Sequence, residues 1–148
     1  MNNTIAKFGY PDSAVAEYAH WVVMFREKQI TAGCLILAAK GSATSFSELS
    51  REALIELSIV TTDIEKSLKS LMNFEKMNYI VLMMVDPHFH FHVIPRHSAP
   101  RDLGGISIGD AGWPRHPDFG AVRELSPGDL NQVRDAVRRG WQRSPSAQ

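Results

Sequence analysis

Two uninterrupted apolar runs near the start of the chain predict two buried strands. Residues 18–25 end in the run WVVMF, and residues 34–39 read CLILAA, with a charged turn and Gly33 between them. Runs of this length, bounded by turn residues, are typical of strands inside a core. Residues 1–13 are polar and contain Gly9 and Pro11, so we expect a loop or a surface arm there.

The next pattern has the period of a helix. From Ser50 to about residue 73, apolar residues recur at steps of three and four, which predicts a long helix with one face on a sheet. Ser50 can cap it, and Glu52 places negative charge in its first turn. The residues that carry the period are Leu54, Leu57, Ile64, Leu68 and Leu71.

Two more strands are expected after this helix. Residues 78–85 form an apolar run, and Asp86-Pro87 indicates a turn. Residues 88–93 then alternate strictly between histidine and an apolar residue, HFHFHV. Because successive side chains on a strand point to opposite faces, the three imidazoles share one face and the apolar residues face the core.

Glycine and proline recur through residues 98–125, which predicts a long loop that could cover the histidine row. Ser126-Pro127 then opens a last helix over 126–143, with Trp141 at the end of its apolar stripe. Its arginines form either a solvated face or a contact for an anionic partner. Residues 144–148 are expected to fray.

The order strand, strand, long helix, strand, strand indicates an α+β fold with helices against an antiparallel sheet. At 148 residues and 44% hydrophobic, the chain is expected to be one domain over 1–148, with its core at about 18–97. The charges balance at 16 basic and 16 acidic residues, which argues against a nucleic-acid partner. The single Cys34, the absence of a signal peptide and the short apolar runs predict a cytoplasmic protein without a membrane span.

Three interpretations of the histidine row are open. It could be the polar face of a half-exposed strand. It could bind a metal such as zinc, although His88 and His92 would lie roughly 13 Å apart on a straight strand, too far for one ion to collect all three rings. The third interpretation is nucleophilic catalysis, in which the middle imidazole attacks and its neighbours bind an anionic substrate.

The row HFHFHVI resembles the signature of the histidine triad family, three histidines alternating with apolar residues, and the following Pro95-Arg96 is also common there. The resemblance implies the family's fold, an antiparallel sheet with one long central helix and a C-terminal helix packed against it, often as a homodimer. It implies a nucleotide hydrolase or transferase that needs no cofactor or metal. Such enzymes cleave at an α-phosphorus through a nucleotidyl-histidine intermediate.

The resemblance also assigns roles. His90 would be the nucleophile, with its other ring nitrogen held by a backbone carbonyl, while His88 and His92 support it at the leaving group and the phosphate oxygens. Further candidates for substrate binding are Asn78, Arg96 and Trp113. Arg96 could instead form an ion pair at the strand end, and Trp113 could simply anchor its loop.

The nucleotide pocket departs from the family pattern. Arg26 stands where many members have an acid or amide that binds ribose hydroxyls, and arginine cannot accept a hydrogen bond. Cys34 and the pair Met83-Met84 stand at positions where many members have polar residues. Two functions are therefore open. The first is a hydrolase of phosphoanhydride or phosphoramidate bonds, such as those of dinucleoside polyphosphates. The second is a nucleotide-binding or regulatory module with weak turnover. A metal-dependent enzyme is a third alternative.

Overall fold

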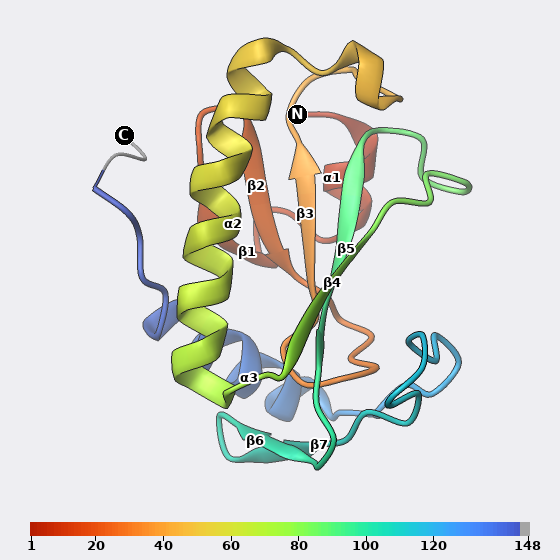
Figure 1. Cartoon of the computed structure of the whole chain (residues 1–148), viewed down its shortest axis with the longest axis vertical. Helices are drawn as coiled ribbons and strands as arrows, with labels where there is room; N and C mark the ends of the chain where they lie inside the picture. The colour runs from red at the N-terminus through yellow and green to blue at the C-terminus, as the bar shows by residue number, and fades with distance from the viewer. Residues whose placement is uncertain (146–148) are drawn as a thin grey trace.

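A five-stranded antiparallel sheet forms the centre of the protein, which we describe from a computed structural model over residues 1–145 (Figure 1). The strand order is β1-β2-β3-β5-β4. The strands are β1 (Ala14–Glu17), β2 (Trp21–Phe25), β3 (Leu35–Ala39), β4 (Lys76–Ile80) and β5 (His90–Arg96). The remaining elements are helices α1 (Asn3–Lys7), α2 (Arg51–Met72) and α3 (Pro127–Arg139), the short 3-10 helix η1 (Phe46–Glu48), and a separate hairpin of β6 (Arg101–Leu103) and β7 (Ile106–Ile108). The expected α+β fold is confirmed.

Helix α2 lies along one face of the sheet, as its apolar period predicts (Figure 1). The Ser50 side chain accepts a hydrogen bond from the backbone N–H of Ala53, and the helix ends at Asn73 in the left-handed conformation. Its buried residues Ile64 and Leu68 join Phe89, Phe91 and Val93 in the main core cluster. The apolar half of the alternating strand therefore faces α2.

The short helix α1 covers part of the opposite face of the sheet. Ile5 is fully buried there in a second apolar cluster with Val22, Met24, Ile36 and Ala38. The Asn2 side chain caps α1 and also donates to the carbonyls of Ala39 and Gly41 at 3.0 and 2.8 Å. The first residues are thus a fixed part of the fold rather than the loop expected from their polarity.

Helix α3 begins as expected, with Ser126 accepting from the N–H of Asp129, but it ends at Arg139. Trp141 follows the helix and donates its indole N–H to the hydroxyl of Tyr18 at 3.1 Å. The N–H of Ser144 donates to Asp63 at 3.0 Å, so the expected fraying is wrong at this residue. Residues 146–148 of that expectation lie outside the described part of the chain.

The region just before the histidines was predicted least well. The strand expected over 78–85 ends at Ile80, and a loop runs from 81 to 89 with Met83 at a φ of 52°. Consequently β5 begins at His90 and not at His88. Helix α1, strand β1 and the β6–β7 hairpin were not anticipated. Within residues 1–145, no helix combines the length and apolar character that a membrane crossing requires.

Candidate functional site

The three triad histidines come together on the face of the sheet that carries α1. His90 and His92 pair with Ala38 and Ile36 of β3, so they share the face that α1 covers, and their rings lie 5.1 Å apart between centroids. His88 lies in the loop before β5, where its Nδ1 shares a 3.0 Å hydrogen bond with the hydroxyl of Thr4 in α1. The alternation of faces along β5 is therefore confirmed.

The tautomer of His90 is fixed by the backbone. Its Nδ1 lies 2.8 Å from the carbonyl oxygen of His88. A carbonyl oxygen can only accept, so Nδ1 carries the proton in a neutral ring and Nε2 keeps its lone pair. Within residues 1–145, Nε2 makes no hydrogen bond. This is the arrangement expected for a ring that acts as a nucleophile.

The His90 ring is nevertheless almost completely covered. It is 2% exposed, and the ring of Phe8, just after α1, lies 5.4 Å away between centroids. The three imidazoles share one face, as expected, but the central ring is not open to solvent. The sequence did not predict this cover, since the five residues of α1 give no clear periodic signal.

A cleft of about 640 Å³ lies beside the triad, a size suited to a small-molecule ligand. Helix α1, the end of β2, the loop before β5 and helix α3 all contribute to it. We call it the histidine cleft, and it is lined by Lys7, Phe8, Gly9, Asp12, Ser13, Phe25, Arg26, Glu27, Lys28, Val85, Asp86, His92, Leu130, Asn131 and Arg134.

Two polar atoms at this cleft are buried without a partner. They are His92 Nδ1 and Ser13 Oγ, the buried side-chain nitrogen and oxygen atoms of residues 1–145 that make no hydrogen bond. Burial, followed by the neighbouring His90 and the charge of Arg26, lowers the pKa of His92 to about 4, while Asp86 opposes the shift. His92 is therefore neutral at neutral pH. Buried groups without partners are rare in folded proteins, and both residues line the histidine cleft.

The long loop after the triad contacts His92, but through a residue that the sequence did not single out. The ring of Phe119 lies 5.9 Å from that of His92, and the guanidinium of Arg26 lies 5.6 Å from its centroid. Trp113, the expected contact, is half-buried elsewhere on the loop and is not among the described residues that line the cleft. The length and position of the loop indicated a role for it, but no pattern in the sequence pointed to Phe119, Phe8 or Ser13.

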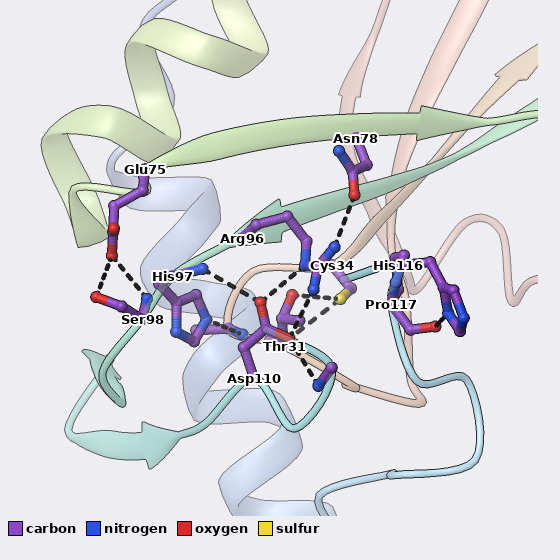
Figure 2. Close-up of polar contacts among 12 residues, drawn as sticks. Thr31, Cys34, Glu75, Asn78, Arg96, His97, Ser98, Asp110, His116 and Pro117 are labelled. Atoms are coloured by element: carbon purple, nitrogen blue, oxygen red, sulfur yellow. Dashed lines mark hydrogen bonds and ion pairs between the residues drawn. The ribbon is translucent and has the colours of Figure 1, made fainter. Parts of the chain in front are cut away.

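The other two expected substrate ligands, Arg96 and Asn78, bind each other and not the cleft (Figure 2). The guanidinium of Arg96 donates to both carboxylate oxygens of Asp110, at 2.7 and 3.1 Å, and to the side-chain oxygen of Asn78 at 2.9 Å. Arg96 and the Asp110 side chain are both buried. The geometry therefore favours the alternative reading of Arg96, an ion pair that holds the end of the strand.

His97 belongs to the same buried network (Figure 2). Its backbone N–H donates to Asp110 at 3.2 Å, its Nδ1 donates to the carbonyl of Ala99 at 2.9 Å, and its Nε2 accepts from the N–H of Ala32 at 3.1 Å. Both ring nitrogens are satisfied in the neutral form, and burial lowers the pKa of the ring. His97 is thus structural.

The remaining departures from the family pattern lie away from the chemistry. Cys34 is buried, its thiol donates to the carbonyl of Thr31 at 3.3 Å, and burial raises its pKa, which makes it unreactive. Met83 and Met84 lie in the loop before β5, with Met84 86% exposed, and neither is among the described residues that line the cleft. Within residues 1–145, no group of three or more histidine, cysteine or acidic side chains is arranged to hold a metal ion.

An antiparallel sheet with one long helix on its apolar face, and an alternating-histidine strand whose central ring is oriented by the backbone, defines the histidine triad class. The family model described as HIT domain matches residues 9–99, more than half of the chain, and the protein belongs to this family. No curated protein matches the chain.

Solved structures share the fold at low sequence identity. A histidine triad protein from Bradyrhizobium japonicum superposes with a TM-score of 0.71 at 19% identity, covering 96% of this chain and 97% of its own. A histidine triad protein from Marinobacter aquaeolei gives 0.71 at 19%, over 95% and 94%. A hypothetical histidine triad nucleotide-binding protein from Sulfolobus tokodaii gives 0.67 at 15%, over 93% and 88%. At these identities the likeness concerns the fold alone.

Proposed function

We propose that the protein is a nucleotide hydrolase or transferase that cleaves at an α-phosphorus through a nucleotidyl intermediate on His90. The observation that carries this proposal is the 2.8 Å hydrogen bond from His90 Nδ1 to the His88 carbonyl, which leaves the Nε2 lone pair free beside His92. Membership of the HIT family, whose members are often nucleotide hydrolases, supports it. No cofactor is required.

The first step is attack of His90 Nε2 on phosphorus. The Nε2–P bond forms as the bond from phosphorus to the leaving group breaks, and the leaving group takes up a proton. His92, neutral and partly buried, can donate an N–H to a phosphate oxygen as charge develops there. Water or another acceptor then breaks the Nε2–P bond and restores the neutral ring.

We assign the supply of the leaving-group proton to His88. The Thr4 hydroxyl oxygen accepts from the backbone N–H of His88 at 3.3 Å and lies 3.0 Å from its Nδ1. Because that oxygen already accepts from the backbone, its own hydrogen can point to Nδ1, and this leaves the His88 proton on Nε2. A neutral imidazole with an N–H at Nε2 can act as a general acid.

The aromatic ring of Phe8 limits access to His90. His90 is 2% exposed, and the two rings lie 5.4 Å apart between centroids. Phe8 follows the last residue of α1 and is half-buried. We infer that its side chain turns aside when a substrate binds in the histidine cleft.

Trapping the intermediate tests this proposal. The protein is incubated with dinucleoside polyphosphates and nucleoside phosphoramidates, quenched at alkaline pH because N–P bonds are acid-labile, and examined by intact mass and peptide mapping. We expect a nucleotidyl adduct on His90 that is absent from His90→Asn. Turnover without any adduct on His90, or an adduct that persists in His90→Asn, would contradict the mechanism.

A second function, a nucleotide-binding or regulatory module with weak turnover, is favoured by one observation, the coverage of His90 by Phe8. If nucleotides bind with micromolar affinity but every tested substrate turns over negligibly, this second function is the correct one. The two outcomes are distinguished by measuring binding and turnover on the same preparations.

We also propose that the protein acts in the cytoplasm as a homodimer. Three exposed apolar side chains of the loop before β5, Leu82, Met84 and Val85, support a contact with a second copy. Light scattering at several concentrations measures the oligomeric state. A monomer at all concentrations would contradict the proposal, and Met84→Asp should shift a dimer toward monomer.

A further inference from the structure

Two of the cations that line the histidine cleft form ion pairs. Lys7 forms a 2.7 Å ion pair with Asp86, and Arg134 forms a 3.0 Å ion pair with Asp135. Arg26 differs from these two cations, because within residues 1–145 no carboxylate lies within ion-pair distance of its guanidinium. The charge of Arg26, which acts on His92, is therefore left without a counter-charge.

Arg26 is held in place by contacts that do not neutralise it. Its backbone N–H donates to the carbonyl of Cys34 at 3.0 Å just past β2, and its guanidinium donates one hydrogen bond to the carbonyl of Lys28. The guanidinium also lies over the ring of Phe119, 5.6 Å from the centroid. Of its five N–H donors, one is used by the described residues.

Arg26 is also coupled to the triad. Phe119 contacts both the guanidinium and the ring of His92, and the charge of Arg26 is one of the causes that lower the pKa of His92. The residue is half-buried, and burial lowers the pKa of its own guanidinium. A partly buried cation that has no counter-charge and several free N–H donors is suited to bind an anion from outside the protein.

We propose that Arg26, stacked on Phe119, binds a second phosphate group of the substrate, beyond the phosphorus that His90 attacks. The proposal rests on the proposed function of the histidine cleft and narrows its substrate class. Nucleotides with two or more phosphate groups are favoured over nucleotides with one phosphate and an uncharged leaving group. The planar guanidinium fork suits two phosphate oxygens at once, which an ammonium group does not.

The second phosphate could be carried in two ways, along a polyphosphate chain or on the ribose. Both present the same chemistry to Arg26, so the probes must separate them. We choose AMP, ADP and adenosine 3′,5′-bisphosphate, and we measure binding by calorimetry so that the result does not depend on turnover.

The test compares Arg26→Gln with Arg123→Gln. Both changes remove one positive charge, but Arg123 is exposed and its guanidinium donates to the carbonyls of Ser107 and Glu124, away from the cleft. In the unmutated protein we expect ADP to bind at least about tenfold more tightly than AMP. Arg26→Gln should weaken the binding of ADP by roughly 10- to 100-fold and the binding of AMP by less than about twofold, in line with the strength of charge-assisted hydrogen bonds. Arg26→Lys should recover part of the loss, and Arg123→Gln should change neither affinity.

Each remaining outcome has a distinct meaning. If the affinity for adenosine 3′,5′-bisphosphate depends on Arg26 and the affinity for ADP does not, Arg26 still binds a phosphate, and that second phosphate is on the ribose. If all three nucleotides weaken equally in Arg26→Gln, or its thermal unfolding midpoint falls well below that of Arg123→Gln, Arg26 is structural and the proposal fails. ADP selectivity without any turnover would overturn the proposed function but keep this proposal, and no nucleotide binding at all would overturn both.

Discussion

The two ends of strand β5 carry similar residue types and are built in opposite ways. At the far end, Arg96, His97 and their partners Asn78 and Asp110 satisfy one another in a buried network. At the near end, His92 Nδ1 has no partner within the described residues, and His90 keeps a free Nε2. The two ends of β5 thus adjoin a closed structural network and the site that we propose to be reactive.

The difference shows why residue type is a poor guide to role. Arg96, beside the triad, was a candidate for substrate binding, yet it belongs to the closed network. Counting hydrogen-bond partners separates structural groups from candidate binding groups, because groups that satisfy each other stabilise the fold, whereas a group left without a partner can accept a ligand at little cost. Arg26, which also lines the histidine cleft, has no carboxylate partner within the described residues, and in this respect it resembles His90 and His92.

The largest expected effect comes from the proposed nucleophile. His90→Asn should lower kcat by at least about 10³-fold, because the ring that forms the covalent intermediate is lost. The same substitution at the structural end, His97→Asn, should lower activity only in proportion to the fraction unfolded. Steady-state turnover with parallel circular dichroism measures both, and equal losses in the two variants would abolish the distinction between the ends.

Breaking the closed network should act on stability. Asp110→Asn leaves the buried guanidinium of Arg96 without its counter-charge, and we expect a loss of about 3–5 kcal/mol in the free energy of unfolding. Lys40→Gln, which breaks a more exposed ion pair with Glu17, is the matched control and should have little effect. Urea unfolding measures both variants. If Asp110→Asn unfolds at the same urea concentration as the unmutated protein, Arg96 has another partner.

Both ends should lose stability at low pH. Burial lowers the pKa of His97, and burial together with His90 and Arg26 lowers the pKa of His92 to about 4, whereas histidines titrate near 6.5 in an unfolded chain. Below pH 6.5 the unfolded state therefore binds more protons, and stability should fall by up to about 1.4 kcal/mol per pH unit for each ring until the folded pKa is reached.

A bound phosphate should separate the two histidines in this pH response. The anion favours the charged form of His92, so AMP should raise its pKa and leave that of His97 unchanged, which histidine NMR titrations measure. His97→Gln should flatten the pH dependence of the urea midpoint, while His116→Gln, on an exposed loop, should not. Equal shifts of both histidines with AMP would contradict the contrast between the ends.

The smallest expected effect concerns access. Phe8→Ala removes the ring that covers His90, and acylation of His90 by diethyl pyrocarbonate should become faster. Phe46→Ala is the control, because Phe46 packs on Phe89 and Phe91 at the opposite face of the sheet. Peptide mapping of the modified protein gives both rates. An unchanged rate in Phe8→Ala would show that Phe8 is not what limits access.

The sequence predicted what depends on local periodicity. The long helix capped by Ser50 and the opposite faces of His90 and Phe91 follow from periods of 3.6 and 2, and both are found. It did not predict what depends on contacts between distant segments. The covering of His90 by Phe8 joins residues far apart in the chain, and the pairing of Arg96 with Asp110 is made by a loop without a period.

The carbonyl of His88 has a consequence for how this site can be studied. The group that sets the protonation pattern of His90 is part of the main chain. No side-chain substitution removes it, so saturation mutagenesis does not test it. Weakening it requires a backbone change, such as an ester in place of the amide between His88 and Phe89. That change also removes the N–H that Phe89 donates to Ala43 at 2.8 Å. Side-chain substitutions can change the surroundings of this imidazole, but the orientation of the ring is set by the path of the main chain.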